Sequence, residues 1–403
     1  MNIKIDKFLN YIFVGMTLIW GMIYHYLPFV GLGYIPLFLS IFCFFVNLFF
    51  NKKIINPPYV FWGLWVVLAI FNSYMKGSNI EGVFAFYLGL FRNFVVLYVA
   101  SLEFRRDKQF FLKFISVCLF IYAFGSFYTL VDELGGGRFL AFEGNMTILS
   151  LMFLVAFGLL QYQYKSISFG MLLVYIVVAL YFIIMGATRK AIGGVAIIMF
   201  MAILANLNLR SYKTVFFTIM SLGLIYCAFN YILDNTILGE RFIEESKAIE
   251  RYVPYQLRDN WFFQFVGDRS RYYVLGWKFF IDNLWMGIGL GNYALHDPFG
   301  HLLHTEYMVQ LTECGIIGTT LYLLFMGWMA YNLLYVFFRI EKRETLIYAG
   351  MYGAILFISF TAWIYQFPIY FIVFGIIIGY CKDKRFKEKL YANRNLQKRR
   401  FVQ

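Results

Sequence analysis

The feature that most constrains this chain is its series of apolar runs, which recur from near the N-terminus to about residue 381. A transmembrane helix needs about 20 consecutive apolar residues, and its backbone satisfies its own hydrogen bonds, which lipid cannot do. The composition agrees, because 61% of the residues are hydrophobic and 14% are charged, against about 45–50% and about 25% in soluble domains. We therefore expect an all-α polytopic membrane protein, with residues 1–403 forming a single domain.

About twelve transmembrane helices are expected from these runs. The first run follows Lys4 and Lys7 as a signal peptide would, but it is long enough to span and no small-residue cleavage site follows it. We therefore expect it to be retained. The expected spans are 9–27, 33–50, 59–75, 83–101, 110–131, 146–163, 167–186, 190–206, 214–233, 315–338, 345–363 and 366–381.

The positions of Lys and Arg indicate the orientation, because these residues collect on the cytoplasmic side of membrane proteins. With the N-terminus inside, most of the 35 Lys and Arg residues fall in the inner connections and in a basic tail, residues 382–403. We expect both termini in the cytoplasm and the tail against the lipid surface. Because the net charge of +13 is distributed in this way, nucleic acid is not an expected partner.

One connection is much longer than the others. Residues 234–303, between the ninth and tenth expected spans, form an extracytoplasmic loop. Loops of this length are usually functional or disordered, and this one is too rich in aromatic residues for disorder. We expect an ordered outer domain over a cavity, so that the working surface faces away from the cytoplasm.

Three outer arginines are candidates for binding an anion. Arg189 stands in a tight outer turn before a helix, and Arg269 and Arg271 precede the tyrosine pair that begins at Tyr272. A guanidinium group can bind phosphate through two hydrogen bonds. Arginine at a membrane edge also serves as an interfacial anchor, and the sequence leaves both interpretations open.

Arg92 lies within an expected span, where a charge is costly. Such residues usually face a cavity or an opposite charge. Glu143 and Glu81 are the candidates for its partner, and the sequence does not choose between them.

A histidine cluster lies at the end of the outer loop. His296, His301 and His304 stand near Asp297, and Glu306 follows. No two of these histidines have the helical spacing of four that a metal site would use, so no metal is expected. His304 is either a structural histidine or a general base, since histidine titrates near neutrality.

A glycine-rich turn, Gly287-Ile-Gly-Leu-Gly-Asn292, precedes this cluster. Its spacing is similar to that of a dinucleotide-binding loop, but no strand precedes it, and we expect no nucleotide there. Gly289 is expected in a turn where the backbone approaches a substrate or another helix.

Together these motifs resemble those of the O-antigen ligase and polymerase superfamily, which assembles bacterial surface polysaccharides. The matching elements in chain order are Thr188-Arg189, Arg271 with Leu275, the turn from Gly287 to Asn292, His304-Thr305, and Gly315 with Gly318. One departure is Thr305, which stands where the family often has Asn after the histidine.

The resemblance implies a metal-independent glycosyltransferase without a cofactor, in the bacterial cytoplasmic membrane, acting at its outer face. Its substrates would be oligosaccharides carried on undecaprenyl diphosphate, and a chain-length regulator is a further expected partner. Arg189 and Arg271 would stabilise the departing diphosphate, and His304 would accept the proton of the attacking hydroxyl. The expected substrate-binding residues are Arg269, Arg92, Tyr272, Glu306, Gly289 and Asn292.

Three activities are compatible with this sequence. The expected one is a polymerase that transfers a growing glycan onto a new lipid-linked repeat unit. A ligase, which transfers the finished glycan to lipid A core or another acceptor, is the alternative and shares the motifs. A flippase for lipid-linked oligosaccharides is a third, but it predicts internal repeats and mid-membrane charges in both halves, and only Arg92 qualifies.

Overall fold

The computed structural model describes residues 2–26, 34–50, 56–77, 83–133, 145–185, 189–206, 255, 258–266, 269–297 and 302–400. Within these ranges the regular secondary structure is helical throughout, which confirms the expected all-α class. The expected span at 214–233 and much of the expected loop at 234–303 lie outside them. The predictions for those segments stay predictions.

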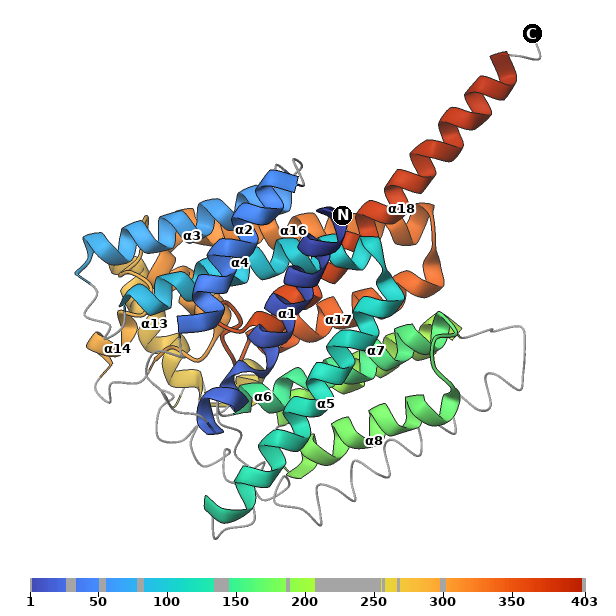
Figure 1. The fold of residues 1–403 in the computed structure, drawn as a ribbon. Coiled ribbons are helices and arrows are strands. Elements are labelled where there is room, and N and C mark those ends of the chain that lie inside the picture. The colour runs from blue at the N-terminus through green and yellow to red at the C-terminus, as the bar shows by residue number, and fades with distance from the viewer. Residues whose placement is uncertain are drawn as a thin grey trace.

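Most of the expected spans fall on helices in the described ranges (Figure 1), but α17 ends at Ser359, so the last residues of the expected span 345–363 lie in the connection that follows. The first helices are α1 (Asn2–Tyr26), α2 (Ile35–Phe50), α3 (Pro57–Met75), α4 (Val83–Arg106), α5 (Lys108–Glu133), α6 (Asn145–Ser150), α7 (Met152–Gln163), α8 (Phe169–Met185) and α9 (Arg189–Asn206). They are followed by α12 (Trp261–Val266), α13 (Ser270–Asp282), α14 (Tyr293–His296), α15 (Glu306–Met308), a π-helical turn (Val309–Glu313), α16 (Cys314–Arg339), α17 (Lys342–Ser359) and α18 (Pro368–Arg400). One expected span, 146–163, is divided at Leu151 into α6 and α7.

Several of these helices have the length and composition of membrane spans. Among the described residues, four stretches are long and apolar enough to cross a bilayer: Pro57–Met75, Phe86–Arg106, Lys108–Gly125 and Glu306–Arg339. Shorter apolar helices cover Ile35–Phe49, Ile148–Gln163, Phe169–Met185 and Lys190–Asn206. These helices support the membrane-protein character of the chain, and the full set of about twelve spans stays a prediction.

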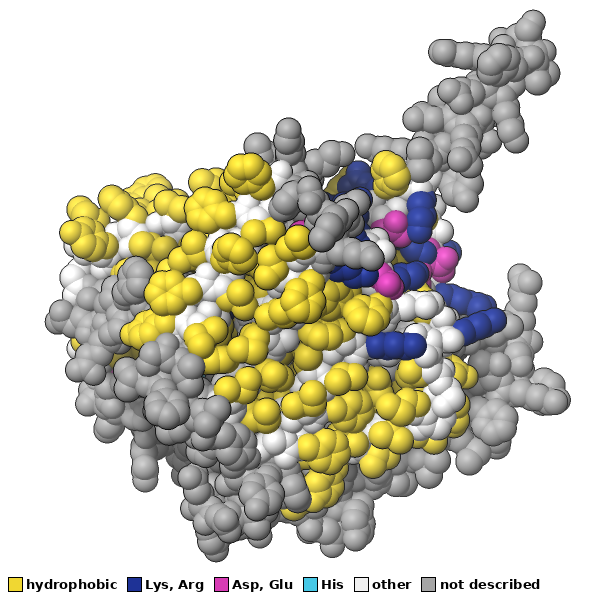
Figure 2. Space-filling model, in the orientation of Figure 1, with side chains coloured by type: hydrophobic (Ala, Val, Ile, Leu, Met, Phe, Trp, Pro, Cys, Tyr) yellow, Lys and Arg dark blue, Asp and Glu magenta, His cyan; other side chains and the backbone are white. Residues whose placement is uncertain are grey.

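The outer surface of the bundle is apolar. On α3, the residues Val60, Leu64, Val67 and Phe71 repeat at helical spacing and are 40–64% exposed. Hydrophobic side chains cover most of the described part of the face drawn in Figure 2. A soluble protein would bury such a stripe in its core, so its natural solvent is lipid.

Charged side chains gather at one end of the bundle, which we call the polar end. There Arg106, at the C-terminus of α4, pairs with Asp6 of α1 at 2.6 Å. Lys384 of α18 pairs with Glu344 of α17 at 2.6 Å. Figure 2 shows this cluster beside the point where α18 leaves the bundle.

The other end of α4 lies at the opposite end of the bundle, which we call the site end. Towards that end, within the first half of α4, Arg92 donates to the carbonyl of Gln366, in the connection between α17 and α18, at 3.3 Å. Lys190, in the first turn of α9, donates to the carbonyl of Thr361 in the same connection. These contacts thus place the α4–α5 turn and the start of α17, both expected to be inner, at the polar end, and the α17–α18 connection, expected to be outer, at the site end. That the polar end faces the cytoplasm stays a prediction.

Helix α18 forms the centre of the bundle. Its apolar half, from Ile369 to Cys381, is buried on every side, and it packs along α4. A helix that is apolar all round belongs in the interior. The shortest of the expected spans is therefore the core helix.

Two glycines four residues apart allow α18 to approach α4 closely. A Cβ placed on Gly375 would lie 2.6 Å from the carbonyl oxygen of Leu97 and 2.7 Å from the Cβ of Ala100. A Cβ on Gly379 would lie 3.0 Å from the carbonyl oxygen of Ser101. Small residues at this spacing are typical of tightly packed membrane helices.

We predict that Gly375→Ala lowers the free energy of unfolding by about 1–3 kcal/mol, because the new methyl group overlaps the α4 backbone. Gly327→Ala on α16 is the matched control, since a Cβ there meets no atom within 4 Å. That change should leave stability unchanged or raise it by up to about 1 kcal/mol, the helix preference of alanine over glycine. Thermal unfolding in detergent measures both, and equal midpoints in the two variants would contradict the proposed contact.

Candidate functional site

Helix α13 is amphipathic. It carries the first part of the candidate site and is anchored by its buried face. Its buried positions Tyr272, Gly276 and Phe280 repeat every four residues, as on one side of a helix. The hydroxyl of Thr312 donates to the carbonyl of Gly276 at 3.0 Å. A Cβ on Gly276 would lie 2.9 Å from Cε of Met308. The absence of a side chain at Gly276 therefore lets α13 lie against the turn that leads into α16.

Tyr272 is the residue around which several expected site residues meet. Its side chain is 2% exposed, and its hydroxyl accepts a hydrogen bond from Nη2 of Arg271 at 2.8 Å. The guanidinium carbons of Arg271 and Arg269 lie 4.7 Å and 5.9 Å from the centre of its ring. The ring of His304 meets it edge-on, with 5.7 Å between ring centres. Arg269, Arg271 and His304 are thus brought together by one tyrosine ring.

His304 also stacks on Trp363, which the sequence analysis did not single out. The two ring centres are 4.6 Å apart, and the planes are inclined by 28°. Both side chains are half-buried. The imidazole is therefore held between Tyr272 and Trp363, which fixes the plane in which its nitrogens point.

Trp363 belongs to the connection between α17 and α18, residues 360–367, and this connection is held by polar side chains from the rest of the site. The donors to its backbone carbonyls are Tyr273 to Phe360 (2.7 Å), Lys190 to Thr361, Asn93 to Tyr365 (2.8 Å) and Arg92 to Gln366 (3.3 Å). Burial raises the pKa of Tyr273 well above its ordinary value, so its hydroxyl stays protonated and remains a donor. The connection links α4, α9 and α13 to the histidine.

The side chain of Glu306 also holds the α17–α18 connection. It is fully buried, and its carboxylate accepts the backbone N–H groups of Ile364 at 2.7 Å and Tyr365 at 3.4 Å. Its other oxygen accepts from the side chain of Gln310 at 2.8 Å. These contacts position the backbone that carries Trp363, and the expected substrate-binding role of Glu306 stays a prediction.

A second buried carboxylate, Glu313, organises the glycine-rich turn. It accepts the backbone N–H of Gly291 at 2.8 Å and that of Tyr293 at 3.1 Å. The two N–H groups come from alternate residues and point at one side chain, an arrangement that we call the nest. A side chain of the protein thus occupies the nest, and the ring of Tyr293 contacts that of Tyr272, with 6.1 Å between ring centres.

The glycine-rich turn approaches another helix, one of the two outcomes expected from its sequence. A Cβ on Gly287 would lie 2.5 Å from the carbonyl carbon of Glu313, and one on Gly315 would lie 2.5 Å from the backbone nitrogen of Gly287. Both glycines have positive φ angles, 69° and 62°, which other residues rarely adopt. The backbone of the turn therefore passes directly over the break before α16.

Gly289 and Asn292, two expected substrate-binding residues, lie inside this packing. A Cβ on Gly289 would lie 2.7 Å from Nδ2 of Asn292. That amide nitrogen donates to the carbonyl of Ile288 at 2.9 Å, and Asn292 is 2% exposed. In this structure both residues shape the turn, and contact with a substrate stays a prediction for them.

Arg189 and Arg92 occupy different parts of the site end. Arg189 begins α9, but its side chain is outside the described part of the chain. Its neighbour Lys190 reaches the α17–α18 connection, which places the start of α9 beside that connection. Arg92 contacts Asn93 and Gln366, and its two expected partners, Glu143 and Glu81, lie outside the described residues.

Two functional candidates, Glu313 and Trp363, were missed, although Glu313 had a signal in the sequence. Like Glu306, it stands at the start of an apolar helix, and the rule that singled out Arg92, an ionisable residue in an apolar run, applies to it as well. Trp363 had no such signal, because its importance comes from contact with His304. Sequence spacing does not show that contact.

The chemistry available at the site end is that of cations and one imidazole around aromatic rings. Two buried acids of the site end, Glu306 and Glu313, accept backbone N–H groups, and a third, Asp297, follows α14 next to Tyr293. Within the described ranges, His, Cys, Asp and Glu side chains form no group of three that could hold a metal ion. The arrangement suits an anionic ligand with a group that gives up a proton.

No protein-family model matches this chain, and no curated protein matches it significantly. The resemblance seen in its motifs therefore stays a hypothesis, carried by the residues themselves.

We predict that Glu313→Ala lowers the free energy of unfolding by at least about 2 kcal/mol, because two buried N–H groups lose their acceptor. Asp282→Ala removes an exposed carboxylate from the end of α13 and is the control. That change should stay within about 0.5 kcal/mol of the parent protein. Thermal unfolding measures both, and similar midpoints would mean that the nest does not depend on this carboxylate.

Proposed function

We propose that this protein is a polymerase of a bacterial surface polysaccharide, acting on glycans linked to undecaprenyl diphosphate at the outer face of the cytoplasmic membrane. The observation that carries the proposal is the meeting of Arg271 and His304 at one tyrosine ring. These residues are distant in the sequence and come from separate motifs of the superfamily that the chain resembles. Their proximity is what that chemistry needs.

The proposed reaction assigns a role to each group. The oxygen of an acceptor sugar hydroxyl bonds to the anomeric carbon of the donor glycan, and the bond from that carbon to the diphosphate breaks. The diphosphate leaves with the electron pair, and Arg271 and Arg269 stabilise its charge. His304 accepts the proton of the hydroxyl. Arg189, at the start of α9, is proposed as a further diphosphate ligand.

Two features of the structure support a lipid-linked substrate. The outer surface of the bundle is apolar, so the polyprenyl chain can remain in lipid while its diphosphate reaches the site end. The half-buried Trp363 and the tyrosines around it offer flat apolar faces of the kind that pack against sugar rings. Cations supply the charge stabilisation that a divalent metal gives in other glycosyltransferases.

We predict that Arg271→Ala, His304→Ala and Arg189→Ala each reduce polymer formation by at least about tenfold, which corresponds to about 1.4 kcal/mol of transition-state stabilisation. Lys278→Ala is the matched control, since this exposed cation stands on the same helix as Arg271. It should retain activity. Chain length is measured on gels of surface glycan at equal membrane expression, and unchanged chains in all three variants would exclude the mechanism.

A deletion strain separates the proposed activity from its alternatives. Loss of a polymerase should leave single repeat units on the surface acceptor. Full-length chains that accumulate on the lipid carrier would indicate a ligase instead, and lipid-linked units retained on the cytoplasmic face would indicate a flippase. Mass spectrometry of the lipid-linked and surface glycans distinguishes these outcomes.

A further inference from the structure

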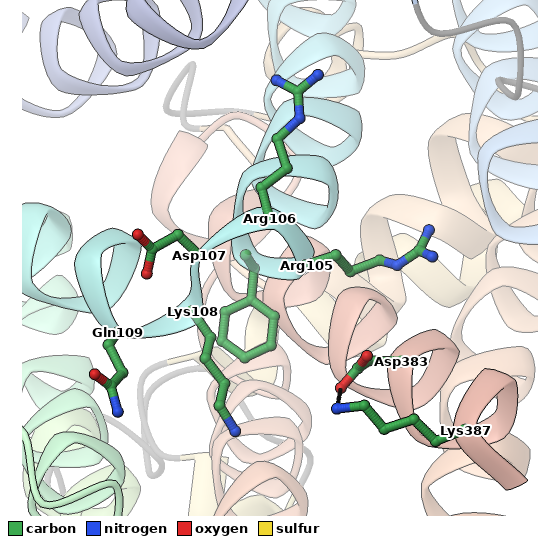
Figure 3. Close-up of a pocket in the computed structure, with 8 residues that line it drawn as sticks. Arg105, Arg106, Asp107, Lys108, Gln109, Asp383 and Lys387 are labelled. Atoms are coloured by element: carbon green, nitrogen blue, oxygen red, sulfur yellow. Dashed lines mark hydrogen bonds and ion pairs between the residues drawn. The ribbon is translucent and has the colours of Figure 1, made fainter. Parts of the chain in front are cut away.

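A second candidate site lies at the polar end, between the α4–α5 turn and α18. The structure has a pocket of about 300 Å³ there, lined by residues 104–109 together with Asp383 and Lys387. In Figure 3, Lys108 and Lys387 extend on the same side of the turn, whereas Arg106 points to the opposite side. The proposed glycan chemistry uses none of these residues.

The lining carries more positive than negative charge. Its basic residues are Arg105, Arg106, Lys108 and Lys387, and its acidic residues are Asp107 and Asp383. Outside the lining, Asp6 and Glu103 bind Arg106 at 2.6 Å and 2.7 Å. An incoming anion would therefore meet chiefly the other three cations.

The carboxylates of the pocket are also engaged. Asp107 accepts the backbone N–H of Phe110 at 3.1 Å and so caps the start of α5. Asp383 pairs with Lys387 at 2.8 Å across one turn of α18. Of the remaining cations, Arg105 is exposed, and Lys108 lies 3.8 Å from the centre of the Tyr164 ring.

Nearby groups show that cations are crowded here. Lys108 lies 3.8 Å from Glu344, but the same carboxylate binds Lys384 at 2.6 Å, so two lysines share one acid. Burial and the neighbouring Arg105 lower the pKa of Lys382 to about 7. An additional anion between α4 and α18 would relieve this repulsion.

The pocket lies at the level of the membrane surface. One stretch long enough to cross the bilayer ends at Arg106, and the next begins at Lys108. Next to the lining residue Lys387 in the sequence, Phe386 is 58% exposed, whereas Phe110 packs on Tyr11 of α1 with 5.2 Å between ring centres. A lipid bound here would have its phosphate against the cations and its chains against the apolar outer surface of the bundle.

We propose that this pocket binds the phosphate of an anionic phospholipid, whose headgroup sits between the α4–α5 turn and α18. Inorganic phosphate is also an anion but has no apolar part, and the apolar outer surface of the bundle favours the lipid. Basic pockets between membrane helices are known to bind acidic headgroups. Binding would join the end of α4 to the core helix α18.

The test measures lipid retention by native mass spectrometry of the full-length protein with phosphatidylglycerol or phosphatidylcholine. The pocket variant is Arg105→Gln with Lys387→Gln, and both side chains are exposed. The control variant is Lys342→Gln with Arg343→Gln, an equal loss of exposed charge in the α16–α17 connection. We expect phosphatidylglycerol to bind the pocket variant at least about tenfold more weakly than the parent, and the control to bind like the parent.

A second measurement does not depend on the variants. Phosphatidylglycerol should raise the thermal midpoint of the parent protein above its value in phosphatidylcholine, because a ligand of the folded state stabilises it. Equal retention by pocket and control variants would overturn the proposal. If inorganic phosphate displaces the lipid or gives the same stabilisation, the pocket takes free phosphate and the lipid assignment is wrong.

Discussion

Backbone that leaves the helical conformation inside an apolar bundle needs internal partners for its N–H and C=O groups, because neither lipid nor apolar side chains supply them. In this protein, one interrupted helix supplies two of the most important partners. Glu306 accepts the N–H groups of the α17–α18 connection, and Glu313 accepts those of the glycine-rich turn. The π-helical turn between them and the positive φ of Gly315 set both carboxylates in place.

The site end sets a cation beside a histidine. Arg271 and His304 share the ring of Tyr272, while Glu306 and Glu313 accept backbone N–H groups. The two irregular segments meet at this point, since Trp363 stacks on the histidine and Tyr293 contacts the tyrosine.

Much of the helical framework was predictable, for a simple physical reason. Apolar runs in lipid must form helices, and each described run does so, including the shortest one, now the buried half of α18. The residues of the site were predictable only in part. Arg271, Tyr272 and His304 were singled out in the sequence and meet in space. Glu306 and Asn292 contact backbone, which the sequence did not indicate, and their expected role in substrate binding stays a prediction. The side chain of Arg189 lies outside the described residues.

By itself, the sequence determined that this chain is helical, that its solvent is largely lipid, and where its cations are concentrated. The composition and the spacing of the apolar runs carry that information, because the preference of a residue for lipid over water depends mainly on its own side chain. The tertiary structure decided which helix is central, which loop carbonyls Arg92 and Lys190 bind, and that Trp363 stacks on His304. Those contacts depend on packing between segments distant in the chain, which no local pattern encodes.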